Sequence, residues 1–227
     1  MKTRKSINKN NKTKKKFKKK NCSPYGEKVK IDDEVCLSGE VIQNIKKSYN
    51  MNNPTNKIKV KNTKKIIERL KEEKPQCESD VCWLSEIKDV NSRKRILKKF
   101  YAPKQPKEWR HNPDEWLSNW DILEVISQYE EKYKNFKFFG PTPIDFDSKD
   151  MYNNKKCVWD ELCNINMKKL INDGKEKLGM IFNLAKQGEA GTHWVSLFID
   201  LKRRYILYFD SNGEDCPKEI EELIKRI

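Results

Sequence analysis

A pair of apolar runs in the last third of the sequence constrains the fold of this chain more than any other feature. The first run, residues 191–200, reads GTHWVSLFID, and the second, residues 204–211, reads RYILYFDS. Both are rich in β-branched and aromatic residues, and only a short polar connection separates them. This pattern predicts two antiparallel strands joined by a tight turn. Apolar side chains fall on both faces of the hairpin, which indicates a strand pair that is covered on both sides.

The expected register of this hairpin places a histidine beside a carboxylate. With Leu201-Lys202 at the centre of the turn, Val195 faces Tyr208 and His193 faces Asp210. Directly opposed residues have Cβ atoms about 5 Å apart. A carboxylate on one imidazole nitrogen fixes the tautomer and leaves the other nitrogen free to act as a base. His193 and Asp210 are therefore candidate catalytic residues, and the alternative is a structural pair at the end of a strand.

Two segments carry a resemblance to a family of enzymes. His193-Trp194, an apolar strand, a short turn and a second strand ending in Tyr208-Phe209-Asp210-Ser211 resemble the SUMO-deconjugating and adenovirus-protease-like cysteine peptidases. Upstream, Trp116-Leu117-Ser118-Asn119-Trp120-Asp121-Ile122 resembles the segment that opens the helix before the catalytic sheet in this family. Within the clan, the sequence is most similar to the polyprotein-processing protease of African swine fever virus and its relatives in giant DNA viruses.

The resemblance implies an α+β fold with a papain-like or adenain-like cysteine protease core. It makes His193 the general base, Asp210 its acidic partner, and Trp194 and Trp116 residues of a substrate channel. Aromatic residues at helical spacing are also typical of a core, so Trp116 has that alternative interpretation. The resemblance implies no metal ion and no organic cofactor.

The family also needs a cysteine nucleophile and an oxyanion-stabilising glutamine, both downstream of the aspartate. The sequence has no glutamine after Gln187, and its one later cysteine, Cys216, lacks the family's Gln-x-x-x-Asp-Cys-Gly setting. We therefore expect a core truncated before its nucleophile, with an incomplete central sheet. Such a chain is expected to be inactive by itself.

Charge divides the chain into regions. Of a net charge of +15, residues 1–20 supply eleven Lys and Arg without any acidic residue, which leaves +4 for the rest. Such blocks repel themselves, stay disordered and often bind nucleic acid or acidic partners. We expect a disordered basic arm at residues 1–30, a helical accessory domain at 31–110, and the protease core at 111–227. The arm has two open interpretations, a phosphate-binding or nuclear-localisation segment and a solvated tail.

Periodic apolar residues predict helices in the accessory domain and in the core. The Lys-rich helices at 37–74 are interpreted as an accessory domain, with a small nucleic-acid-binding module as the alternative. In the core, we expect a helix with a capping box formed by Asp121 and Glu124, and a single helix over residues 159–171. His111, in a Pro-rich connector, is expected to be a surface residue.

The seven cysteines indicate the redox state of the compartment in which the protein is found. The count is odd and no signal peptide precedes the cysteines, so free thiols in a reducing environment are expected. Two close pairs, Cys77 with Cys82 and Cys157 with Cys163, are a weak zinc signal, because a structural site needs four ligands. No apolar run is long enough for a membrane span, so no membrane partner is expected.

These features predict a cysteine-type endopeptidase, a thiol protease of a large DNA virus. Its expected partners are protein substrates, namely viral structural polyproteins cleaved at small Gly-rich motifs or, alternatively, ubiquitin-like conjugates. The expected location is the host cytoplasm at a viral factory, or the virion, with the nucleus as a further option. The alternative function is a virion or scaffold protein that binds nucleic acid through Lys-rich residues 1–20 and carries an inactive protease fold.

Overall fold

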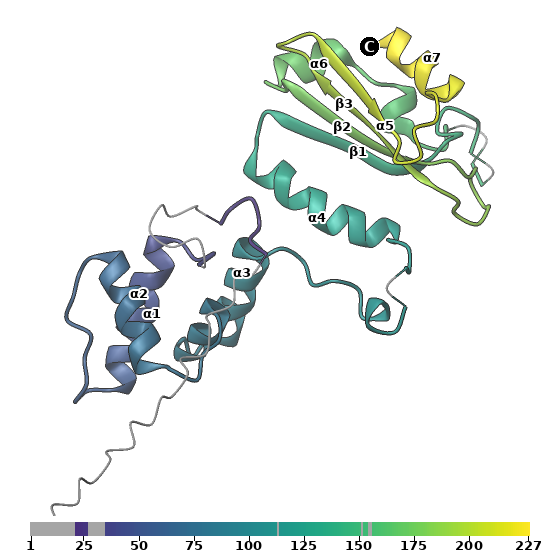
Figure 1. The fold of residues 1–227 in the computed structure, drawn as a ribbon. Coiled ribbons are helices and arrows are strands. Elements are labelled where there is room, and N and C mark those ends of the chain that lie inside the picture. Colours follow the sequence, from purple (N-terminus) through teal and green to yellow (C-terminus); the bar gives the residue numbers. More distant parts are fainter. Residues whose placement is uncertain (1–20, 27–34, 113, 151, 154–155) are drawn as a thin grey trace, which may run out of the picture. The chain divides into compact units, whose positions relative to one another are not determined.

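The chain divides into two compact units, Met1–Ala102 and Pro103–Ile227 (Figure 1). The structure is a computed structural model that describes residues 21–26, 35–112, 114–150, 152–153 and 156–227. Of the predicted basic arm, residues 1–30, the structure describes residues 21–26, and the rest lies outside the described residues. We describe each unit by itself.

The first unit is helical. It contains α1 (Gly39–Asn52), α2 (Thr63–Glu73), the 3-10 helix η1 (Asp80–Glu86) and α3 (Val90–Phe100). Ser38 begins α1 as its N-cap, because its side chain accepts a hydrogen bond from the backbone N–H of Val41. The helices pack around a separate apolar core whose largest fully buried side chains are Trp83, Leu37, Ile42, Ile45, Ile66, Ile67 and Leu70.

Six of the seven cysteines form disulfides, so the prediction of free thiols is wrong for these six. The pairs are Cys22–Cys36, Cys77–Cys82 and Cys157–Cys163, and Cys216 is free. The first pair forms because residues 21–26 fold back onto the end of α3. There the N–H of Ser23 donates to the carbonyl oxygen of Phe100 at 3.0 Å. An odd cysteine count could not reveal this fold-back.

The second unit is built on a mixed four-stranded sheet in the order β1-β2-β3-β4. Strand β1 (Phe136–Pro143) is parallel to β2 (Lys177–Asn183), and β3 (Trp194–Asp200) is antiparallel to both β2 and β4 (Tyr205–Phe209). Helices and a mixed sheet in one unit confirm the predicted α+β class.

The connection from β1 to β2 contains two short helices where one was predicted. They are α5 (Asp160–Cys163) and α6 (Met167–Asn172). The break occurs because Asn166 acts as a new N-cap, its side chain accepting a hydrogen bond from the N–H of Lys169.

One face of the sheet holds the core of this unit. Its buried residues are Phe139, Ile144, Phe146, Leu162, Leu178, Met180, Phe182, Val195, Leu197 and Ile199, with Ile220 and Leu223 from α7 (Lys218–Arg226). Helix α4 (Asn119–Lys132) lies beside β1, away from α7 (Figure 1). The prediction that the hairpin is covered on both sides is wrong for β4 within the described residues. Its side chains at Tyr205, Leu207 and Phe209 are exposed.

Helix α4 begins three residues earlier than the predicted capping box at Asp121 indicated. Its N-cap is Ser118, whose side chain accepts from the N–H of Asp121 while the Asp121 carboxylate accepts from the N–H of Ser118. The capping box therefore joins Ser118 and Asp121, and the prediction of Asp121 with Glu124 is wrong. Among the helices that the structure describes, none combines the length and apolar character of a membrane span.

Candidate active site

The hairpin that carries the candidate residues has a longer turn than predicted. Leu197 pairs with Tyr208, and Asp200 pairs with Tyr205, so residues 201–204 form the connection. Arg204 closes it with a left-handed backbone (φ 54°). The register differs from the prediction by two residues. Side chains in a strand alternate with a period of two, so this shift leaves each of them on its predicted face.

His193 and Asp210 contact each other at the end of this hairpin. His193 directly precedes β3 and Asp210 directly follows β4. The Nε2 atom of His193 lies 2.5 Å from Oδ1 of Asp210. The His193 side chain is 21% exposed and the Asp210 side chain only 1% exposed. The carboxylate is therefore shielded while the imidazole stays accessible to a reacting group.

The backbone beyond β4 keeps Asp210 charged. Its Oδ1 also accepts a hydrogen bond from the N–H of Asn212 at 2.8 Å. This bond, followed by the one with His193, lowers the pKa of Asp210 below the usual value of a carboxyl group. An ionised carboxylate on Nε2 favours the tautomer that carries its proton there. The Nδ1 atom of His193 is then the nitrogen available to act as a base.

Asn183 holds the loop that leads to His193, and the sequence analysis did not identify it. Its Oδ1 accepts hydrogen bonds from the N–H groups of Ala185 and Thr192, each at 3.0 Å. The N–H of Leu184 then donates to the carbonyl oxygen of His193 at 2.9 Å. A Cβ atom on Gly191 would lie 2.9 Å from Nδ2 of Asn183, so this close approach needs glycine. A buried asparagine at the end of an apolar strand was the available signal.

Trp194 connects β3 to the segment before α4. Its Nε1 donates to the carbonyl oxygen of Leu117 at 3.1 Å, which places Trp194 beside the neighbour of Trp116. Trp116 is 52% exposed, so the interpretation of Trp116 as a core residue is wrong. The use of Trp194 and Trp116 as a substrate channel remains a prediction.

Cys216 is poorly suited to act as the nucleophile. Its side chain is half-buried and packs against the core of the second unit. Burial, with a smaller contribution from Glu221, raises the pKa of its thiol. Since the thiolate is the reactive form, a raised pKa makes Cys216 less reactive than an ordinary exposed thiol.

The one cluster of metal-ligand side chains among the described residues does not suit a metal ion. The ligand atoms of Asp147, Cys157 and Cys163 lie within 4.8 Å of one another. The two sulfurs are joined in a disulfide, and Nη1 of Arg226 lies 2.9 Å from Oδ2 of Asp147.

His111 is exposed, as predicted for a surface residue.

The second unit is similar to known viral cysteine peptidases. Residues 129–227 match the family model of the Ulp1 protease family, C-terminal catalytic domain. Protein R355 of Acanthamoeba polyphaga mimivirus, whose name describes a thiol protease, is 39% identical over 112 residues, or 49% of this chain. The match spans 34% of that protein, about a third of its length.

A solved structure shows the same fold. The crystal structure of the ASFV pS273R protease aligns with a TM-score of 0.50 and 17% identity, over 91% of this chain and 70% of that chain. These findings confirm the resemblance to viral Ulp1-like cysteine peptidases and the adenain-like α+β fold.

Proposed function

We propose that the second unit supplies the base and its orienting carboxylate to a cysteine endopeptidase that cleaves viral structural polyproteins at small Gly-rich motifs. The contact between His193 Nε2 and Asp210 Oδ1 carries this proposal, because it leaves Nδ1 as an accessible base. The match of residues 129–227 to a protease catalytic domain supports it.

In the proposed mechanism, Nδ1 of His193 takes the proton of the nucleophile's thiol. The thiolate attacks the substrate's peptide carbonyl, and the imidazolium then gives its proton to the leaving amine. Asp210 holds the ring in one orientation and stabilises the imidazolium. The hydrogen bond from Asn212 N–H to Asp210 Oδ1 keeps the carboxylate in the position in which it contacts His193.

The thiol is proposed to come from outside residues 1–227. This part of the proposal rests on Cys216, whose pKa is raised by burial. A nucleophile that serves a histidine needs an accessible thiol with a lowered pKa. The purified 227-residue chain is therefore expected not to cleave a Gly-Gly-containing peptide.

The test measures the cleavage of a Gly-Gly-containing peptide by variants of the full gene product. His193→Ala is expected to lower kcat by about 10²- to 10⁴-fold, the usual contribution of a general base. Cys216→Ser is expected to leave kcat unchanged. If Cys216→Ser abolishes turnover, in the full product or in the 227-residue chain, the assignment of the nucleophile is wrong. If His193→Ala retains full activity, the proposed base is wrong.

An inactive fold that serves as a virion scaffold is the second candidate. The eleven basic residues among residues 1–20 favour it, because such arms bind phosphates without needing an active site. A full gene product that cleaves no Gly-rich peptide, but binds DNA, would favour this candidate. For either function we propose the host cytoplasm, at a viral factory, or the virion as the location.

A further inference from the structure

A lysine-rich stretch of the first unit is free of acidic residues. From Val41 to Ile67 the sequence has seven lysines and no Asp or Glu. Six of these lysines are exposed, Lys47, Lys57, Lys59, Lys61, Lys64 and Lys65, and Lys46 is half-buried. The stretch covers most of α1, the connection to α2 and the start of α2. It is folded, in contrast to what the sequence predicts for residues 1–20.

Polar side chains of α1 hold the connection in place. Asn50 Nδ2 donates to the carbonyl oxygen of Ile58 at 3.0 Å, and the N–H of Ile58 donates to Asn50 Oδ1 at 2.7 Å. One and two turns earlier on α1, Lys46 Nζ reaches the carbonyl of Val60 at 3.2 Å and Gln43 Nε2 that of Lys61 at 2.8 Å. The backbone of residues 58–61 is thereby fixed along the helix.

The alternation of burial along this connection directs three lysines to solvent. Ile58 is buried and Val60 is half-buried, while Lys57, Lys59 and Lys61 between and beside them are exposed. In an extended chain, alternate residues are about 6.6 Å apart, so the three ammonium groups form a row. Each has room to meet a different phosphate, because phosphates on one strand follow each other about every 3.4 Å of helix axis.

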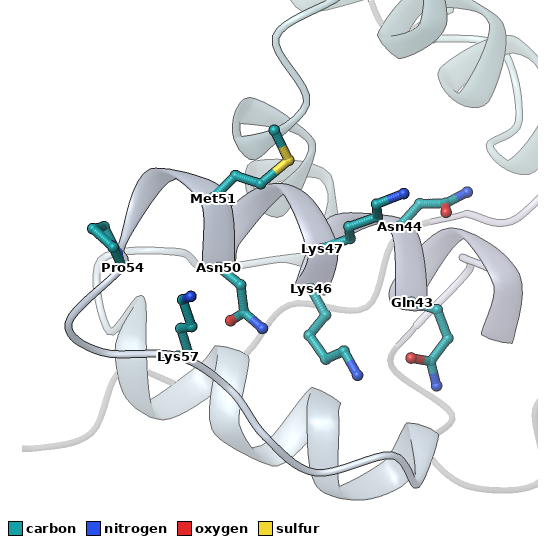
Figure 2. A pocket seen from close by; sticks show the side chains of 8 residues that line it. All are labelled: Gln43, Asn44, Lys46, Lys47, Asn50, Met51, Pro54 and Lys57. Carbon is teal, nitrogen blue, oxygen red and sulfur yellow. The ribbon is translucent and has the colours of Figure 1, made fainter.

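An open depression lies next to this row, and Lys57 belongs to both (Figure 2). It has a volume of 640 Å³ and is lined by Gln43, Asn44, Lys46, Lys47, Asn50, Met51, Pro54 and Lys57. Figure 2 shows Gln43, Lys46 and Asn50 directed from α1 toward the connection, and Asn44 and Lys47 on the other side of the helix. The lining is therefore cationic and rich in amide groups that can donate hydrogen bonds.

The lysines of this surface form no ion pairs. Within the part of the chain that the structure describes, none of the seven lysines lies within 4.0 Å of a carboxylate oxygen. On α2, Glu72 and Glu73 pair with Arg69 at 2.7 Å and 2.5 Å. Glu73 also accepts a hydrogen bond from Asn56, next to Lys57, and offsets part of the charge at that end of the connection. Clusters of lysines without ion pairs attract polyanions.

We propose that the lysine face, defined as Lys46, Lys57, Lys59 and Lys61, binds the phosphate backbone of duplex nucleic acid without reading its sequence. Lysine is a point charge that suits phosphates, and the face has no arginine for bidentate recognition of bases. Its one aromatic neighbour, Tyr49, is only 3% exposed, so the stacking that holds single strands is missing.

Two other polyanionic partners fit the surface less well. An acidic peptide or an anionic membrane would gain affinity from apolar contacts around the charges. Met51, at 74% exposed, is the exposed large apolar residue of the depression. Duplex nucleic acid needs only the charges and hydrogen-bond donors that the face offers.

The test measures binding of the full chain to a short mixed-sequence DNA duplex by fluorescence anisotropy, between about 50 and 200 mM salt. The triple variant Lys57→Gln, Lys59→Gln and Lys61→Gln is expected to bind about 10- to 100-fold more weakly and to lower the slope of log K against log salt by about 2.7. These substitutions remove no side-chain hydrogen bond within the described part of the chain, and circular dichroism checks the fold.

Two matched controls remove the same charge elsewhere. Lys168→Gln, Lys169→Gln and Lys202→Gln, all exposed in the second unit, are expected to bind like the wild type. The variant Lys14→Gln, Lys15→Gln and Lys16→Gln measures the contribution of the arm. The proposal is overturned if the arm variant alone weakens binding, or if an acidic peptide or anionic vesicles bind more tightly than the duplex. Peptide cleavage, which depends on His193, is a separate readout.

Discussion

At the scale of single residues, the His193–Asp210 pair is positioned by its backbone surroundings as much as by the hairpin. Asn183 fixes the loop on the histidine side, and the N–H of Asn212 fixes the carboxylate. The accessible face of the imidazole is therefore set by three short segments, each at the end of a strand. A site placed at strand ends is held by rigid elements and remains open to substrate.

The lowered pKa of Asp210 has a consequence for acid stability. The folded state binds this proton more weakly than the unfolded chain does, so the stabilisation is complete above the usual carboxyl pKa of about 3.9. It is lost as the pH falls through the lowered folded-state pKa. Asp210→Asn is expected to lower Tm at pH 7, with the difference from the wild type closing as the pH falls below the usual carboxyl pKa.

Thermal unfolding of both proteins across this pH range checks the expectation. Asp114→Asn, which changes an exposed carboxylate of the connector, is the control. Its curve should follow that of the wild type at all pH values. A constant gap between Asp210→Asn and the wild type that persists below the usual carboxyl pKa would mean that the charge of Asp210 does not stabilise the fold.

At the scale of elements, the start of α4 links the helix to the candidate site. Ser118 caps the helix, and the adjacent Leu117 carbonyl accepts the hydrogen bond of Trp194. Ser118→Ala is expected to lower the free energy of unfolding by about 1 kcal/mol, since the N–H of Asp121 loses its partner. Hydrogen exchange at residues 119–122 should become faster.

Ser127→Ala provides a control within the same helix. The hydroxyl of Ser127 donates to the carbonyl of Glu124 and caps nothing, and alanine is the better helix former. Stability should therefore stay the same or rise slightly. Equal losses for both serines would show that the capping box does not stabilise α4.

Several elements followed from the sequence because local chemistry determines them. The apolar runs at residues 191–200 and 204–211 predicted both strands, and Ser38, a residue type that commonly caps helices, begins α1. The turn length was not predictable in the same way. A four-residue connection needs a left-handed residue, and Arg204 adopts that conformation without the glycine that normally signals it.

The sequence predicted the contact between His193 and Asp210 correctly, although the predicted register was wrong by two residues. A two-residue shift keeps the face of every side chain, so His193 still lies diagonally across from Asp210. Asn183 escaped detection because its role depends on a loop that returns to it from Thr192. The parallel pairing of β1 with β2 likewise depends on contacts distant in sequence.

At the scale of the whole molecule, each unit has its own apolar core, and disulfides reinforce both units. The Cys22–Cys36 bridge has a sequence separation of 14, and loop closure of this length stabilises a fold by about 3 kcal/mol. Cys157–Cys163, with a separation of 6, closes a shorter loop and is expected to contribute about 2 kcal/mol. Reduction of Cys22–Cys36 should therefore lower the free energy of unfolding of the first unit by more than reduction of Cys157–Cys163 lowers that of the second unit.

Alkylation of the denatured protein without reductant tests these pairs. Mass spectrometry should find Cys216 as the one labelled cysteine of seven. After reduction, all seven should be labelled. If seven thiols react without reductant, the chain is reduced as the sequence predicted, and the disulfide contribution to stability does not exist.

Strand β4 lies at the edge of the sheet and, within the described residues, pairs only with β3. Its outer backbone N–H and C=O groups can form hydrogen bonds with a strand of another molecule, and such pairing leads to aggregation. Charged residues flank it on both sides, with Lys202, Arg203 and Arg204 before it and Glu214 and Asp215 after it. These charges act as gatekeepers against aggregation. The net charge of +15 makes molecules of this protein repel one another, and salt screens exposed charges, so the protein should be handled at low ionic strength.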